Sequence, residues 1–287
     1  MQQCNMTTTT IFVIAVFLGS LQQGAYAQGT QTIGTAAPLE TDSAGHTGQA
    51  AVTSVFRVIC KENGTFGTGF LHKSGNVITA AHVIDGCANP VIALPDNKTL
   101  VAAKVMRADY DKDLALLKPE TPISGNPLPI SNTPDLAYGA EIAFWGFPSG
   151  YVGVPPMLSV GYIAGIDGVR TKTNKIVPQL VVNAAINHGN SGGPVLLVET
   201  GEVIGVADNK IAPLSDVALS ALNALQNQPS GFTFTATSPD GKTRTFSEAQ
   251  VVAMVLEELR QQVQLVIGHA VMLGDLRTFL TDCGVDP

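Results

Sequence analysis

The sequence lacks any cluster of basic residues. Its 16 Lys and Arg are scattered and are outnumbered by 23 Asp and Glu, which gives a formal net charge of −7. Proteins that bind nucleic acid or an anionic membrane surface present such clusters. We therefore expect no nucleic-acid partner, and no membrane contact once a signal peptide has been removed. Charged residues make up only 14% and hydrophobic residues 45%, enough for one large or two small domains with a sizeable core.

Long hydrophobic runs are also missing. The apolar run at residues 11–18 is too short to span a bilayer and is typical of a secretory signal. A small-x-small cleavage site follows at residues 25–27. We predict a signal peptide at 1–27, export to the periplasm or the medium, and a flexible leader at 28–50. Since residues 1–10 carry no Lys or Arg, a buried N-terminal strand or an uncleaved anchor is the alternative.

Cysteines are few. Cys4 would leave with the signal peptide, so the exported chain would keep Cys60, Cys87 and Cys283. An oxidising compartment allows one pair to close, and Cys60 with Cys87 is the preferred pair. In the alternative, all three thiols are buried and reduced.

Metal-ligand spacing is missing too. The histidines His46, His72, His188 and His269 show no such spacing with Cys, Asp or Glu. We expect no metal site and no cofactor.

Turn-forming residues, in contrast, are abundant. The 29 Gly and 17 Pro lie between short Val/Ile/Leu runs, which indicates an all-β fold of barrels or sandwiches. Proline-rich residues 119–134 predict a linker between one β unit at 51–118 and a second at 135–283. Helical spacing at 216–226 and 247–263 predicts a helical insertion, 211–265, and a short helix is expected at 275–282. The insertion either packs on the second unit or forms a regulatory or oligomer-forming arm.

One glycine-rich stretch carries a candidate nucleophile. Ser191 lies within Gly189-Asn190-Ser191-Gly192-Gly193. Such a turn can aim a hydroxyl and backbone N–H groups at one point, as a nucleophile with an oxyanion hole requires. The same residues also suit an ordinary surface turn.

Two further residues complete a catalytic constellation. His82 follows an apolar strand, and Asp113 opens another. The order His, Asp, Ser is that of a serine-peptidase triad. His82 would accept the Ser191 proton, and Asp113 would hold the imidazole. The N–H groups of Gly189 and Ser191, with Asn190 between them, would form the oxyanion hole.

These stretches resemble the chymotrypsin/trypsin-like serine peptidases, and more closely their bacterial HtrA (Deg) branch. The resemblance lies in residues 79–83, 113–117 and 183–194. It implies two antiparallel β-barrels within a domain at 51–283, and a site in the cleft between them. It also implies hydrolysis of protein or peptide substrates through an acyl-enzyme. No downstream PDZ signature is visible, and Asn190 replaces the aspartate that digestive members pair with a new N-terminus.

Specificity follows only from this resemblance. It implies that Ala185 and Ile186 line the pocket for the residue before the scissile bond, which favours a small aliphatic side chain. It also implies that the strand edge around Val206, Ala207 and Asp208 pairs with substrate backbone. Asp208 either points into the pocket, favouring a basic residue, or is solvated at a strand end.

Two other functions compete with this interpretation. Gly189 to Gly193 also fits the nucleophile elbow of α/β-hydrolases, but residues 192–198 do not favour the helix that must follow, and only His269 would remain as base. The second alternative is a non-catalytic secreted binding protein whose cleft the insertion occludes. The sequence does not indicate an oligomeric state.

Overall fold

The computed structural model describes residues 51–96, 98–133, 136–171, 173–210, 216–227, 232–237, 243–262 and 267–287. The predicted signal peptide and leader lie outside these residues. The described residues divide into two compact units, one within 51–210 and 267–287 and the other within 216–262. No helix within the described ranges is long and apolar enough to cross a membrane.

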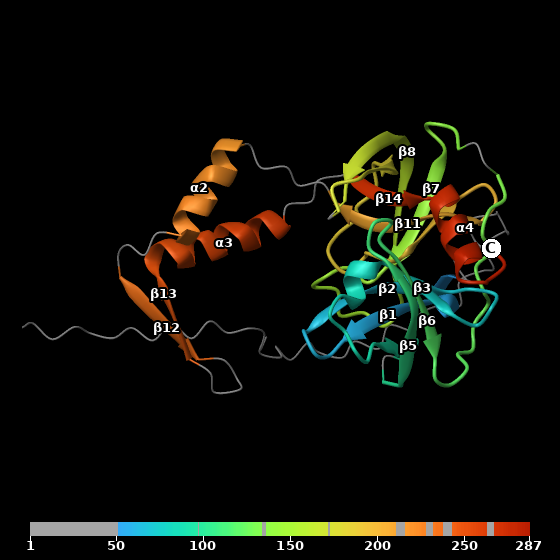
Figure 1. Cartoon of the computed structure of the whole chain (residues 1–287), viewed down its shortest axis with the longest axis horizontal. Coiled ribbons are helices and arrows are strands. Elements are labelled where there is room, and N and C mark those ends of the chain that lie inside the picture. The colour runs from blue at the N-terminus through green and yellow to red at the C-terminus, as the bar shows by residue number, and fades with distance from the viewer. Residues whose placement is uncertain are drawn as a thin grey trace, which may run out of the picture. The chain divides into compact units, whose positions relative to one another are not determined.

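The first barrel is closed and antiparallel, with strand order β1-β2-β3-β6-β5-β4 (Figure 1). Its interior is filled by apolar side chains such as Phe56, Val58, Ile92 and Leu117, which are all essentially inaccessible to solvent. The strands are β1 (Val55–Cys60), β2 (Thr65–Leu71), β3 (Val77–Thr79), β4 (Val91–Ala93), β5 (Leu100–Asp109) and β6 (Leu114–Pro119), and the short 3-10 helix η1 spans Ala81–Ile84.

The second barrel is also closed and antiparallel, with strand order β10-β11-β14-β9-β8-β7. A shared core joins it to the first barrel, since Phe70 and Ile78 from the first belong to one apolar cluster with Val206 and Val271 from the second. The elements are β7 (Glu141–Gly146), β8 (Met157–Arg170), β9 (Ile176–Val182), β10 (Pro194–Leu197), β11 (Val203–Lys210), β14 (Gly268–Met272) and the C-terminal helix α4 (Leu273–Asp282).

The insertion is more than a pair of helices. Between α2 (Asp216–Asn227) and α3 (Glu248–Gln262) it contains a hairpin of β12 (Thr233–Thr237) and β13 (Thr243–Ser247). α3 begins with reciprocal hydrogen bonds, from Gln250 N to Ser247 Oγ (3.2 Å) and from Ser247 N to Gln250 Oε1 (2.9 Å), a capping box. The hairpin is the part that the helical spacing did not predict.

The fold class is confirmed, but one predicted strand is misplaced. The sequence predicts a strand over 180–186, whereas β9 ends at Val182 and residues 183–186 form a loop. Asn183 N still donates to Tyr162 O at 3.1 Å, but Tyr162 N donates to the side-chain Oδ1 of Asn183 at 2.6 Å instead of to a backbone carbonyl. This loop leads directly into the Ser191 turn.

Candidate active site

His82 and Asp113 form a tightly bonded pair in the first barrel. His82 lies in η1, one turn after the end of β3, and Asp113 immediately precedes β6. The Nδ1 of His82 lies 2.6 Å from Asp113 Oδ2, and the His82 N–H donates to Asp113 Oδ1 at 2.9 Å. Asp113 has a φ of 55°, a conformation rare for residues other than glycine. The two bonds fix both the imidazole and the carboxylate that faces it.

The Ser191 turn comes from the second barrel but is attached to both. The Ser191 carbonyl accepts a hydrogen bond from Thr68 N on β2 at 2.8 Å, and Gly192 N donates to Ala207 O on β11 at 2.7 Å. Gly192 has a φ of 87°, and a Cβ there would overlap the Thr68 carbonyl. A glycine is therefore required directly after the candidate nucleophile.

Thr68 is a site residue to which the sequence analysis assigned no role. Its Oγ1 donates to Gly189 O at 2.8 Å and accepts from Phe147 N at 3.1 Å, and its carbonyl accepts from Thr79 Oγ1 at 2.6 Å. Thr79 ends the strand that leads to His82. One buried threonine thus holds the backbone of the Ser191 turn against the strand that positions the histidine.

Some backbone N–H groups of the Ser191 turn already donate hydrogen bonds within the protein, and others do not. Asn190 N donates to Asn187 O, and Gly193 N donates to Asn190 O, both at 3.0 Å. Among the described residues, no acceptor pairs with the N–H of Gly189 or Ser191. His188 O accepts from Ser149 N at 2.6 Å, which turns the Gly189 N–H away from Ser149, because the two groups of a peptide point in opposite directions. Gly189 and Ser191 remain the two candidate oxyanion donors, whereas the Asn190 N–H is occupied.

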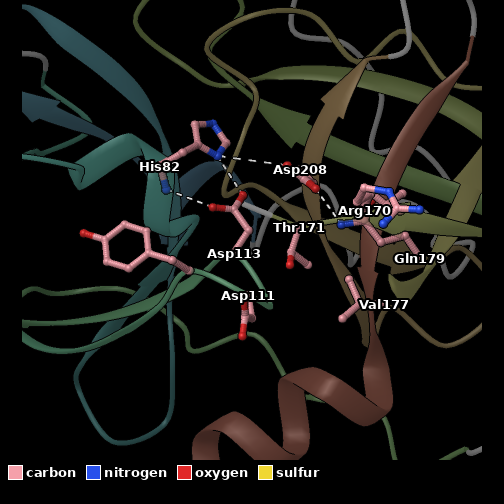
Figure 2. A pocket seen from close by; sticks show the side chains of 10 residues that line it. His82, Asp111, Asp113, Arg170, Thr171, Val177, Gln179 and Asp208 are labelled. Carbon is pink, nitrogen blue, oxygen red and sulfur yellow. Dashed lines mark hydrogen bonds and ion pairs between the residues drawn. The ribbon is translucent and has the colours of Figure 1, made fainter. Parts of the chain in front are cut away.

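Asp208 is buried and does not lie solvated at a strand end. It is only 6% exposed, and its Oδ2 accepts a hydrogen bond from Gln179 Nε2 at 2.6 Å. Its Oδ1 lies 4.0 Å from His82 Nδ1, so the carboxyl group lies beside the His82–Asp113 pair (Figure 2). Burial, and next the charge of Asp113, raise the pKa of Asp208 to about 7. The interpretation as a solvated strand-end residue is wrong, because β11 carries the side chain inward.

A hollow of about 300 Å³ opens beside this group. Neither Ala185 nor Ile186 lines it. Ile186 is 1% exposed and packs in the core of the second barrel, whereas Ala185 is half-buried. The hollow is lined by His82, Tyr110, Asp111, Asp113, Val169, Arg170, Thr171, Val177, Gln179 and Asp208.

The strand edge expected for substrate begins later than predicted. Val206 pairs with Pro194 on one side and with Val271 on the other, and both backbone groups of Ala207 bond to Gly192 and Gly193. A free edge can therefore begin only at Asp208, where the pairing of β11 with β14 becomes irregular.

The cysteines lie as the sequence analysis preferred. The sulfur atoms of Cys60 and Cys87 are within bonding distance, with Cα atoms 5.7 Å apart, and Cys283 is a half-buried free thiol. Two groups could bring ligand atoms together around a cation, Cys60 with Glu62 and Cys87, and His82 with Asp113 and Asp208. The expectation of no metal site therefore stays a prediction.

Two closed barrels, with a His–Asp pair on one and a serine in a glycine-rich turn on the other, are the arrangement expected of trypsin-fold serine hydrolases. Residues 67–206 match the family described as "Trypsin-like peptidase domain". Residues 67–206, just under half of the chain, thus form a trypsin-like peptidase domain of the serine hydrolase type, and curated relatives include Deg-type serine proteases.

Three curated relatives illustrate this. "Protease Do-like 1, chloroplastic" of Arabidopsis thaliana is 35% identical over 145 residues, 49% of this chain and 32% of the relative. "Putative serine protease HhoA" of Synechocystis is 36% identical over 49% of this chain and 36% of its own length. "Probable periplasmic serine endoprotease DegP-like" of Halomonas elongata is 33% identical over 51% and 30%. The match spans about a third of each relative.

Solved structures support the same fold. The HtrA-type protease AlgW with a tripeptide gives a TM-score of 0.55 at 20% identity, over 84% of this chain and 63% of that chain. The Rv3671c protease from M. tuberculosis in its active form gives 0.55 at 19% identity, over 83% and 84%. At these identities the likeness concerns the fold alone.

Proposed function

We propose that this protein is an exported serine endopeptidase in which Ser191 attacks the peptide bond, His82 acts as general base and acid, and Asp113 orients the imidazole. The observation that carries this proposal is the attachment of all three to one framework: the His82–Asp113 pair at 2.6 Å, and the Ser191 turn tied through Thr68 to the strand before His82. The names of the relatives, which describe serine proteases, support it.

The chemistry follows from the roles of these groups. The imidazole takes the Ser191 proton as Oγ forms a bond to the carbonyl carbon, and Asp113 stabilises the resulting imidazolium. The N–H groups of Gly189 and Ser191 bind the developing oxyanion. The imidazolium then protonates the leaving amine, and water hydrolyses the acyl-enzyme by the same route. No cofactor takes part in these steps.

The domain proposed for this activity comprises residues 51–283. Ala185 is half-buried and the neighbouring Ile186 is fully buried, so this wall offers little room to a substrate side chain. We therefore propose a preference for a small aliphatic residue before the scissile bond. The apolar segment at 11–18 and relatives named as periplasmic support export, where the nearby sulfurs of Cys60 and Cys87 would close a disulfide.

A fluorophosphonate probe tests the triad. We expect the folded protein to label at Ser191 and to cleave a peptide library, and Ser191→Ala to lose both activities. Asp113→Asn should lower kcat by about 10⁴-fold, because the imidazole then adopts the wrong tautomer. Asp111→Asn is the matched control, since Asp111 lines the same hollow but pairs with Lys175 instead of His82.

A folded sample that binds peptides without labelling would contradict the proposal. That result would favour a non-catalytic binding protein on the same fold.

A further inference from the structure

We propose that Asp208 is a positioning residue, which shares one proton with Asp113 and thereby fixes the carboxylate that holds the His82 imidazole. This inference rests on the proposed peptidase function. It adds a second carboxyl group, one that the His, Asp, Ser order did not predict.

The closeness of the two carboxyl groups favours a shared proton. Carboxylate oxygens of Asp208 and Asp113 lie within 4.8 Å of each other, and two ionised carboxylates can only accept hydrogen bonds. Asp113 already uses both oxygens as acceptors, Oδ1 for the His82 N–H and Oδ2 for the imidazole. On this proposal Asp208 is the protonated member of the pair and donates its O–H toward the Asp113 carboxylate.

The surroundings of Asp208 favour the protonated form. The Asp208 side chain is only 6% exposed. Its Oδ2 accepts a hydrogen bond at 2.6 Å from the side-chain amide of Gln179, which carries no charge. Figure 2 shows the carboxyl group between Gln179 on one side and the His82–Asp113 pair on the other. Two carboxylates this close repel each other, so one proton between them lowers the energy of the pair.

The other charged groups nearby face different partners. Across the hollow, Asp111 pairs with Lys175, and the side chain of Arg170 donates to Asn174. Tyr110 and Arg170 line the same hollow. On the neighbouring strand β14, His269 lies 4.0 Å from Asp167. Because His82 is the nearest cation when protonated, ionisation of Asp208 acts mainly on His82 and Asp113.

A pH-dependent effect on His82 follows. Below about pH 7 the neutral Asp208 donates to Asp113 and adds no charge. Above it, the proton leaves to solvent, and the imidazole faces two carboxylates. Two negative charges stabilise the imidazolium, which cannot act as a base, and the groups titrate as a coupled set.

Two substitutions separate positioning from packing. Asp208→Asn keeps the size of the side chain, an N–H donor toward Asp113 and an acceptor for Gln179, but carries no charge. We expect kcat within about 3-fold of wild type, and an acidic limb of kcat/KM moved to lower pH by about 0.5–1 unit. Asp208→Ala removes the donor, and we expect kcat to fall about 10–100-fold with little change in KM. Asp282→Asn is the charge control, with a wild-type profile, because Asp282 lies outside the hollow and pairs with Arg107.

A spectroscopic measurement is independent of catalysis. In the inactive Ser191→Ala protein, infrared difference spectra against the Ser191→Ala/Asp208→Asn double variant should show the carbonyl stretch of a protonated carboxylic acid at pH 5. This band should disappear as the pH rises through about 7. All samples contain EDTA, because a cation shared by the three side chains would also displace the proton.

The outcomes separate this inference from the proposed function. Absence of the band, or its loss near pH 4, overturns the shared proton. Superimposable pH profiles and equal kcat for wild type and both Asp208 variants overturn the positioning role. If the band titrates as expected but the wild-type protein neither labels nor cleaves, the carboxyl pair stands and the peptidase proposal fails.

Discussion

Thr68 connects the two barrels at the level of a single residue. Its backbone N–H holds the Ser191 carbonyl, its hydroxyl holds Gly189 and Phe147, and its carbonyl holds the Thr79 side chain. All these groups are buried, and a buried polar group without a partner costs about 1–3 kcal/mol. Thr68 therefore contributes both to stability and to the geometry of the candidate nucleophile.

Replacing Thr68 by valine tests this role. Thr68→Val keeps the shape but leaves Phe147 N–H and Gly189 O without their hydroxyl partner. We expect a loss of about 2–4 kcal/mol in the free energy of unfolding, measured with urea, and slower labelling of Ser191 by a fluorophosphonate. Thr65→Val on the same strand is the control, because Thr65 is exposed. Equal losses in both variants would show that the buried hydroxyl has no special role.

Residue spacing predicted some parts of the site and missed others. The His82 and Asp113 stretches were recognisable because each side chain stands at the end of an apolar strand, a pattern local to the sequence. The positions of Thr68 and Gln179 depend on contacts between distant strands, which no local pattern encodes. Asp208 was misplaced because the alternation of β11 alone does not show which side faces the triad.

At the scale of elements, short apolar strands were more predictable than polar ones. β3 is the apolar strand expected before His82, and α2, α3 and α4 lie close to their predicted ranges. β12 and β13 were missed although Thr233–Thr237 alternates Thr with Phe and Ala at the period of a strand, because the helical spacing on both sides was taken to describe the whole insertion. Asn183 ended β9 early through a side-chain hydrogen bond that strand propensity does not register.

The Cys60–Cys87 contact joins the end of β1 to the turn after η1. We expect this pair to close in the exported protein. Reduction, or the double substitution Cys60→Ser/Cys87→Ser, should then lower the free energy of unfolding by about 3–4 kcal/mol, because the unfolded chain regains the freedom of the closed loop.

Urea titrations with and without dithiothreitol measure this effect. Cys283→Ser is the control, since that thiol is free in the structure. An effect of the reductant that persists in the double variant would contradict the assignment.

At the scale of the whole molecule, the insertion enters and leaves through neighbouring positions. Lys210 on β11 and Gly268 on β14 are paired across the sheet, and paired residues in antiparallel strands lie about 5 Å apart. The compact unit formed around residues 212–263 can therefore be removed without stretching the barrels.

Replacing residues 212–266 by a four-residue glycine-serine turn tests whether the barrels fold and react without the insertion. We expect the shortened protein to remain folded and to label at Ser191 at a rate within about 3-fold of the full chain, since the barrel strands keep their pairing. Fluorophosphonate labelling and analytical ultracentrifugation give the readouts. A change in mass per particle, or loss of labelling in a folded sample, would identify the insertion as an oligomer-forming or regulatory arm.

The bond between Thr68 and Ser191 also governs when the site can exist. The ribosome makes the imidazole and carboxylate first and the serine turn much later, and the turn takes its shape only against a strand of the earlier barrel. Neither half of the chain can assemble the site alone. On the proposed mechanism, a polypeptide still being synthesised therefore carries no complete proteolytic centre until both barrels have folded.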